Sequence, residues 1–180
     1  MKIRVSKLQA AQRQADTAIR MLFSGEDPVS IHTLAMASFR ILRDLAKHQG
    51  NNTFLANTDL IIKKSKERQF WGGLQSFSNF LKHADRDPEA IKEGIDEKVN
   101  DGILLFVTEL YSTLGNELTP EMRALKYWFI GKNSHLITSD AESRFLKEIA
   151  ENFSPDLEGL SRDEQLAKGA EYIAMAKARR

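Results

Sequence analysis

Cysteine is absent from the 180 residues of this chain, and this absence excludes several kinds of chemistry. Without a thiol there is no disulfide, no thiolate nucleophile and no zinc–cysteine site. A chain without cysteine suits a reducing compartment, so we expect a cytoplasmic protein.

Long apolar runs are also missing. The longest strongly apolar run, residues 103–107, is far shorter than the roughly 20 residues that a membrane-spanning helix needs. The basic N-terminus leads into residues 8–13, which mix apolar residues with glutamines and an arginine, and not into an apolar signal core. We therefore expect neither a membrane span nor a secretion signal.

Proline and glycine are scarce, with 4 and 10 copies, which permits long helices. The chain is 42% hydrophobic and 28% charged, the composition of an ordinary globular protein. Apolar residues recur at helical spacing in most segments, beginning with residues 6–24, and no long segment alternates with a period of two. These patterns predict an all-α protein, a single multi-helix bundle of about six to eight helices covering residues 1–180.

Several residue pairs predict where helices begin. Asp27-Pro28 and Asp87-Pro88 each combine an aspartate that can cap free amides with a proline suited to the first helical position. Thr58 is expected to cap another helix, and capping boxes are expected at residues 139–142 and 161–164.

Glycine and asparagine predict where helices end or break. Gly50 is expected to end the second helix, and Gly72-Gly73 to interrupt or kink a later one. The triplet at residues 100–102 is expected to break the segment between residues 91 and 114.

Phosphate-binding glycine loops, zinc-protease HExxH motifs and nucleophile elbows are all missing, so histidine becomes the informative residue. The chain has four histidines: His32, His48, His83 and His135. We expect no cofactor, and we treat His135, in a turn-like segment, as a surface residue.

The densest group of usable side chains surrounds His83. It lies at a predicted helix end, where the helix dipole favours the imidazolium. His83 is therefore a candidate proton donor, with Lys82 or Arg86 holding a phosphate and with Asn79 and Asp85 as further binding residues.

Two other interpretations of this segment stay open. His83, Asp85 and Asp87 offer nitrogen and oxygen ligands at every second residue, a pattern open to manganese, iron or zinc. Alternatively Asp87 is only a helix cap, and Asp85 pairs with Arg86 across a turn.

The segment from Arg43 to His48 carries an arginine, a polar residue (Asp44) and a histidine. It resembles the motif of the HEPN superfamily of helical proteins. The resemblance implies a dimer that joins two such motifs, and metal-independent RNA cleavage with His48 in acid–base work and Arg43 on the phosphate. In an unbroken helix, residues five apart are separated by about 140°, so a break near His48 is needed for them to meet.

Lysines and aromatic residues lie close together between residues 63 and 71. Lys63 and Lys64 supply charge for phosphate, and Trp71 supplies a ring for a base. The first 90 residues hold 14 lysines and arginines against 9 acidic residues, whereas the last 90 hold 12 against 16. A solvated helix followed by core aromatics gives the same pattern, so both interpretations stay open.

His32 shares a predicted helix face with Met36, Phe39 and Arg43. Asp16 and Arg20 on the first helix are candidates to face it and complete a polar pocket. The alternative is a histidine that belongs to the core.

The function expected first is a dimerising interaction or binding protein whose partners are a second copy, another protein or RNA, and no membrane. The alternatives are a HEPN-like metal-independent ribonuclease of the toxin or phage-defence type, and a metal-binding helical protein using His83 and Asp85.

Overall fold

The computed structural model describes residues 2–51, 67–83, 85, 87–93, 96–133 and 157–178. Within these ranges there are six α-helices, one short 3₁₀ turn and no strand, so the prediction of an all-α fold is confirmed. The elements are α1 (Lys7–Phe23), α2 (Pro28–His48), α4 (Glu67–Phe80), α5 (Val99–Thr113), α6 (Pro120–Lys132), η4 (Leu157–Gly159) and α8 (Arg162–Ala178).

The first two helices begin and end as their capping residues dictate. Ser6 and Gln9 form a reciprocal capping box at the start of α1. Asp27 caps α2 by accepting a hydrogen bond from the amide of Ser30 at 2.8 Å. Gly50 follows α2 with φ of 70°, a left-handed conformation that favours glycine, and the predicted stop is confirmed.

The starts of α6 and α8 are also capped. The hydroxyl of Thr119 accepts a hydrogen bond from the amide of Met122. In the capping box predicted at residues 161–164, the amide of Ser161 donates to the Glu164 carboxylate, and the amide of Glu164 donates back to the Ser161 hydroxyl. Local hydrogen bonding therefore sets these helix starts.

Three boundary predictions are wrong. Helix α4 continues through Gly72 and Gly73 without interruption, because Trp71 before the pair and Leu74 after it both pack on the hydrophobic core. Asp87-Pro88 starts no helix in the described residues that follow, so Asp87 is not a helix cap there. Residues 100–102 form the first turn of α5 and do not break it. The helix predicted after Thr58 and the capping box at residues 139–142 lie outside the described residues.

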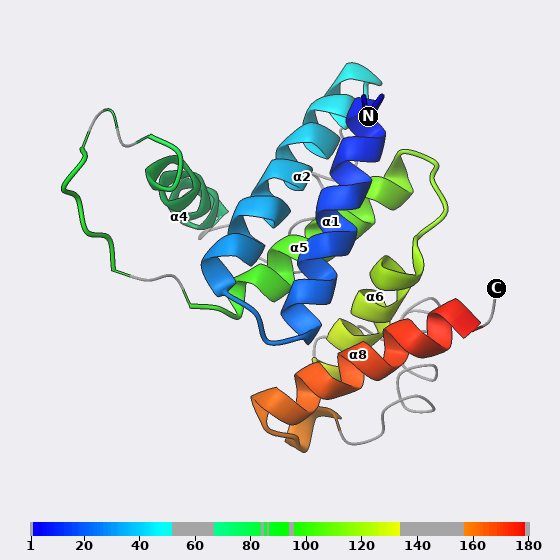
Figure 1. Ribbon diagram of the computed structural model, residues 1–180. Helices are drawn as coiled ribbons and strands as arrows, with labels where there is room; N and C mark the ends of the chain where they lie inside the picture. Colours follow the sequence, from blue (N-terminus) through cyan, green and yellow to red (C-terminus); the bar gives the residue numbers. More distant parts are fainter. Residues whose placement is uncertain are drawn as a thin grey trace.

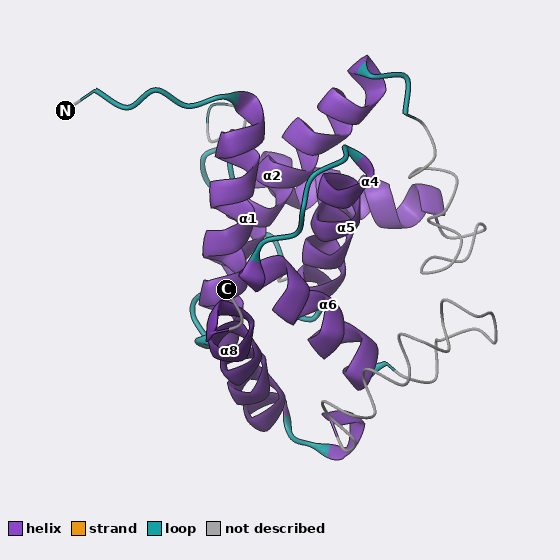
Figure 2. Ribbon diagram, turned by 90° about the vertical axis from the view of Figure 1, so that its right-hand side faces the viewer, coloured by secondary structure: helices purple, strands orange, loops and turns teal. Residues whose placement is uncertain are grey.

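The described helices share one hydrophobic core. Helices α1 and α2 lie side by side, with α5 behind them and α6 and α8 at one end (Figure 1). Helix α4 packs on α2 at the other side of the molecule, as the rotated view in Figure 2 also shows. Burial of each large aliphatic or phenyl side chain contributes about 1.5–3 kcal/mol. The largest fully buried residues are Trp128, Phe106, Ile19, Leu42, Ile103, Leu104, Leu110, Met122, Leu125 and Leu157.

Among the residues described, no helix is both long and apolar enough to cross a bilayer.

A buried charge network fastens α8 to the rest of the bundle. The Asp101 carboxylate, which is 2% exposed, accepts two hydrogen bonds from Arg162 at 2.8 and 2.9 Å and a third from Lys132. Both cations also lie over the ring of Trp128. The Trp128 indole N–H donates to the carbonyl of Gln165 at 2.6 Å. Each buried charge is thus compensated, which burial requires.

Candidate functional site

Two cations, Arg40 and Lys82, lie near the place where the C-terminal end of α4 packs against α2. Arg40 donates a hydrogen bond from its guanidinium to the Asn79 side-chain oxygen at 3.1 Å, which directs it toward α4. Lys82 lies three residues after Asn79, in the turn that follows α4. Partial burial and the nearby positive charge of Arg40 both lower the pKa of the Lys82 ammonium.

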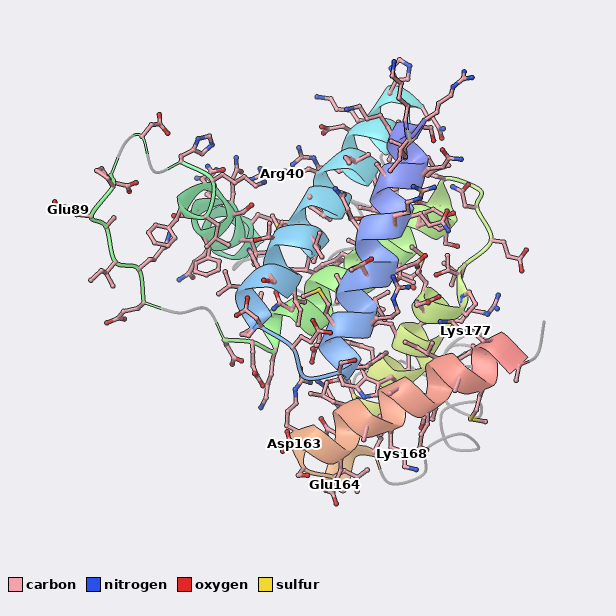
Figure 3. The ribbon with its side chains drawn as sticks, viewed as in Figure 1. Arg40, Glu89, Asp163, Glu164, Lys168 and Lys177 are labelled. Carbon is pink, nitrogen blue, oxygen red and sulfur yellow. The ribbon has the colours of Figure 1, made fainter. Side chains whose placement is uncertain are left out.

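This pair of cations is not neutralised by the described part of the chain. No described carboxylate forms an ion pair with Arg40 or Lys82, whereas Lys126, Lys168 and Lys177 each have an acidic partner. Figure 3 shows Arg40 on the side of α2 that faces α4, with Glu89 far out on the loop beyond α4. The junction therefore presents positive charge that an anion would compensate.

A hollow of about 590 Å³ lies beside the junction, between α4 and residues 87–92. Asn79 and His83, which flank Lys82 in the sequence, are among the residues that line it. The Lys92 ammonium donates a hydrogen bond to the hydroxyl of Ser76 at 2.6 Å across one wall. The hollow is polar in part and open to solvent, as a site for a large ligand must be.

His83 is exposed and lies three residues after the end of α4. Its Nδ1 is 3.8 Å from Oδ1 of Asp85, so the two residues form a loose pair. The described residues contain no group of three histidine or acidic side chains placed to hold a metal ion. Of the three expected metal ligands, His83 and Asp85 lie near each other, and with Asp87 they do not form such a group.

His32 is fully buried beneath this junction, and sequence reasoning did not connect it with Lys82. Its Nδ1 lies 3.1 Å from the side-chain oxygen of Asn100, and its ring makes an edge contact with Phe77. Burial lowers the pKa of His32, and the positive charges of Lys82 and Arg40 lower it further, although the hydrogen bond with Asn100 opposes them. Burial therefore favours the neutral form of this core imidazole.

Two buried polar atoms at this interface make no hydrogen bond with any described residue. They are Nε2 of His32 and the hydroxyl of Ser78, whose residues are 0% and 1% exposed. Ser78 directly follows Phe77, which touches His32, and precedes Lys82 by one helical turn. An apolar residue at either position would avoid the cost of burying an unpaired polar group.

The other predicted catalytic pair does not converge within one chain. Helix α2 is unbroken from Pro28 to His48, so Arg43 and His48 point about 140° apart around its axis. Arg43 instead pairs with its neighbour Asp44 at 3.0 Å, and His48 is an exposed residue at the helix end.

The predicted nucleic-acid residues have mixed outcomes. Trp71 is partly buried against the core, stacked on Phe39 at 5.1 Å and tilted against Phe106 at 5.3 Å. Lys63, Lys64, Arg86 and His135 lie outside the described residues.

Asp16 and Arg20 face a different part of the bundle from the one expected. Asp16 accepts a hydrogen bond from the Thr119 hydroxyl at 2.6 Å, and Arg20 pairs with Glu121 at 2.9 Å. Both are therefore directed at the start of α6 and do not complete a pocket with His32. The reason is that α1 lies between α2 and α6, and these polar residues occupy its α6 side.

The pKa values of the two carboxylates in this second cluster, Asp16 and Glu121, shift in opposite directions. Burial, and then the charge of Glu121, raise the pKa of Asp16 despite the hydrogen bond from Thr119. Burial alone would raise the pKa of Glu121 too, but hydrogen bonds from Lys177 and Arg20 outweigh it and lower that pKa. The polar groups of this cluster largely satisfy one another, which makes it a helix-docking contact and a weaker candidate site.

Comparison of the chain with protein-family models, curated proteins and solved structures finds no match.

Proposed function

We propose that this protein binds RNA through its phosphates, using the cation pair Arg40 and Lys82 at the junction of α2 and α4. The observation that carries the proposal is the unneutralised pair itself. Two cations held close together by the fold repel each other, and a phosphate between them removes that cost. Arginine and lysine are the usual phosphate contacts of nucleic-acid-binding proteins.

The neighbourhood suits a polyanion better than an isolated ion. Lys92 and His83 line the adjoining hollow, and Arg68 is exposed at the start of α4. The first 90 residues, which contain these groups except Lys92, hold 14 basic and 9 acidic side chains. A chain of phosphates would contact several of these groups, whereas a single small anion would contact only the pair.

The test is the affinity for a single-stranded RNA oligonucleotide, measured by fluorescence anisotropy over a range of salt concentrations. Arg40→Gln and Lys82→Gln should each weaken binding, and each should reduce the slope of log affinity against log salt by about one. Because removal of either cation relieves repulsion, neither variant should lower the Tm, so weaker binding would not reflect unfolding.

The matched control is Lys168→Gln on α8, where Lys168 pairs with Glu171 at 2.7 Å on a face far from α4 (Figure 3). This variant should bind RNA as the wild type does. Equal loss in the control and in Lys82→Gln would mean that binding is a diffuse charge effect, and the proposal would be wrong.

A metal-independent ribonuclease is the second candidate, favoured by one specific observation. The exposed imidazole of His83 directly follows Lys82, so a phosphodiester held by Lys82 would lie beside a proton donor and acceptor. Cleavage of RNA in excess EDTA that is lost in His83→Ala would support this activity. Cleavage lost in Arg43→Ala and His48→Ala, but kept in His83→Ala, would favour the HEPN-like pair and its expected dimer instead. No cleavage by the wild type would exclude both for the RNAs tested.

A further inference from the structure

The protonation state of His32 follows from its hydrogen bonds. Asn100 donates from its side-chain nitrogen to the carbonyl of Pro28 at 3.0 Å, so its side-chain oxygen is directed at the histidine. An oxygen accepts, and Nδ1 of His32 must therefore carry the proton. Nε2 is left with a lone pair, buried on the side of the ring that has no described partner.

Two cations act on this ring, one from α2 and one from the turn after α4. Arg40 is eight residues after His32 on α2, and Lys82 lies at the end of α4, beyond Phe77 and Ser78. From α5, the residue that reaches the ring is the neutral Asn100. The next residue, Asp101, is turned to the other side, where Lys132 and Arg162 neutralise it. The charged groups acting on His32 in the described structure are thus the two cations of the proposed site.

We propose that His32 is the proton-linked member of the anion site, so that binding of a phosphate to Arg40 and Lys82 favours protonation of Nε2 of His32. This inference rests on the proposed function and adds a coupling that RNA binding alone does not require. It needs no direct contact between phosphate and imidazole.

The coupling is electrostatic. In the free protein, burial and the two cations hold the pKa of His32 below its usual value. A bound phosphate neutralises the field of Arg40 and Lys82, and so removes part of what opposes the imidazolium. Because linkage is reciprocal, a ligand that favours protonation must itself bind more tightly as the pH falls.

Protonation of Nε2 would require a hydrogen-bond acceptor, and Ser78 is the candidate among the described residues. An imidazolium is a donor at both ring nitrogens, and a buried Nε2–H without an acceptor is costly. The Ser78 hydroxyl is also buried without a described partner, on the helix whose Phe77 contacts the His32 ring. A hydroxyl can accept from an N–H, so a side-chain movement that brings the hydroxyl to Nε2 would supply the acceptor. Ser78 is therefore a positioning residue for the protonated state.

The experiment measures the affinity for an oligouridine RNA between pH 5.5 and 8, a range in which this probe does not titrate. It uses the His83→Gln background, so that the exposed histidine beside Lys82 does not contribute. Binding should tighten as the pH falls, by up to about tenfold per pH unit between the pKa values of His32 in the free and bound protein. Ser78→Ala should flatten this dependence while leaving the affinity at pH 8 unchanged.

A second measurement needs no variant of His32. NMR titration of the His32 ring, with and without saturating RNA, should show a higher pKa in the complex. Binding that is independent of pH, with the same His32 pKa in both states, would overturn this inference and leave the proposed RNA site intact. No binding at any pH would overturn both. Weaker binding in Lys82→Gln together with an unchanged pH dependence would assign the proton to another group and would also overturn the inference.

Discussion

A buried neutral imidazole ties the stability of this protein to pH. His32 has a folded-state pKa below the ordinary value of 6.5, so between these two values the unfolded chain binds more protons than the folded one. Its contribution to stability is therefore fully present above pH 6.5 and is lost as the pH falls through the window below it. We expect RNA binding to favour protonation of this same residue.

We accordingly expect the free energy of unfolding to fall between pH 7 and pH 5.5 in the absence of RNA, when measured by urea denaturation. RNA at saturating concentration should reduce that loss, because the bound protein accepts the proton. An equal free energy of unfolding at both pH values in RNA-free protein would contradict the neutral state of His32.

The cluster at the start of α6 offers a test with two neighbouring carboxylates. Since burial and Glu121 raise the pKa of Asp16, its ionised form costs stability at neutral pH, and Asp16→Asn should leave stability unchanged or raise it by up to about 1 kcal/mol. Glu121→Gln should instead lower it by about 1–3 kcal/mol, because Arg20 and Lys177 lose their shared partner.

Chemical denaturation of both variants at pH 7 checks this prediction. The pKa of Glu121 is lowered by folding, so the loss in Glu121→Gln should be present above pH 4.5 and should shrink as the pH falls below it. Equal destabilisation by the two substitutions would mean that the carboxylates are equivalent, contrary to their opposite pKa shifts.

Two helical glycines differ in the space around them, so replacing each with alanine distinguishes the effect of packing from that of helix propensity. A Cβ at Gly169 on α8 would lie 2.1 Å from the ring of Phe23 on α1, and the Phe23 ring is itself held against Trp128. A Cβ at Gly73 inside α4 would meet nothing within 4 Å. The same substitution should therefore have opposite results at the two positions.

Gly169→Ala should lower the free energy of unfolding by about 1–3 kcal/mol through overpacking. Gly73→Ala should raise it by about 0.5–1 kcal/mol, because alanine is the better helix former in an open position. Thermal or urea denaturation measures both. A stabilising Gly169→Ala would show that α8 does not press on α1 as closely as the structure has it.

These elements also show what sequence could and could not predict. The caps Asp27, Thr119 and Ser161 were predictable because each acts on amides two or three residues away. The Gly72-Gly73 prediction failed because the cost of glycine in a helix is small beside the burial of aromatic and aliphatic side chains around it. Asp87-Pro88 has the same local chemistry as Asp27-Pro28, but no described helix follows it. Such differences depend on tertiary contacts.

Some residues of the candidate site could be identified from the sequence and others only from the structure. Lys82, His83 and Asn79 were found from their density in one segment. Arg40 was not found, because it lies 39 residues before Asn79 and only packing of α2 on α4 brings them together. His32 was recognised as a candidate core histidine, but no local signal links it to Lys82.

At the scale of the whole molecule, the first turn of α5 lies between two polar clusters of the protein. Asn100 faces α2 and holds His32, while its neighbour Asp101 faces α6 and α8 and holds Lys132 and Arg162. Residues 100 and 101, which were expected to break a helix, thus supply the polar partners of His32 on one side and of Lys132 and Arg162 on the other. The α2–α4 site and the α8 docking contact lie on opposite sides of this turn.

Asp101→Asn tests this division. The substitution removes the carboxylate that Lys132 contacts and leaves Arg162 with Glu97 alone, 3.5 Å away, so it should cost about 3–5 kcal/mol in the free energy of unfolding. The matched control is Asp163→Asn, at an exposed position in the first turn of α8, which should cost no more than about 1 kcal/mol through the helix dipole. Urea denaturation followed by circular dichroism compares the two.

RNA affinity should respond differently. Measured at a temperature where the variant is still folded, Asp101→Asn should bind as the wild type does, since Arg40 and Lys82 lie on the other side of α5. If loss of the Asp101 network weakens RNA binding as much as Lys82→Gln does, the two sides of the bundle are coupled through this turn. His32, Asn100 and Asp101 would then have to be treated as one system.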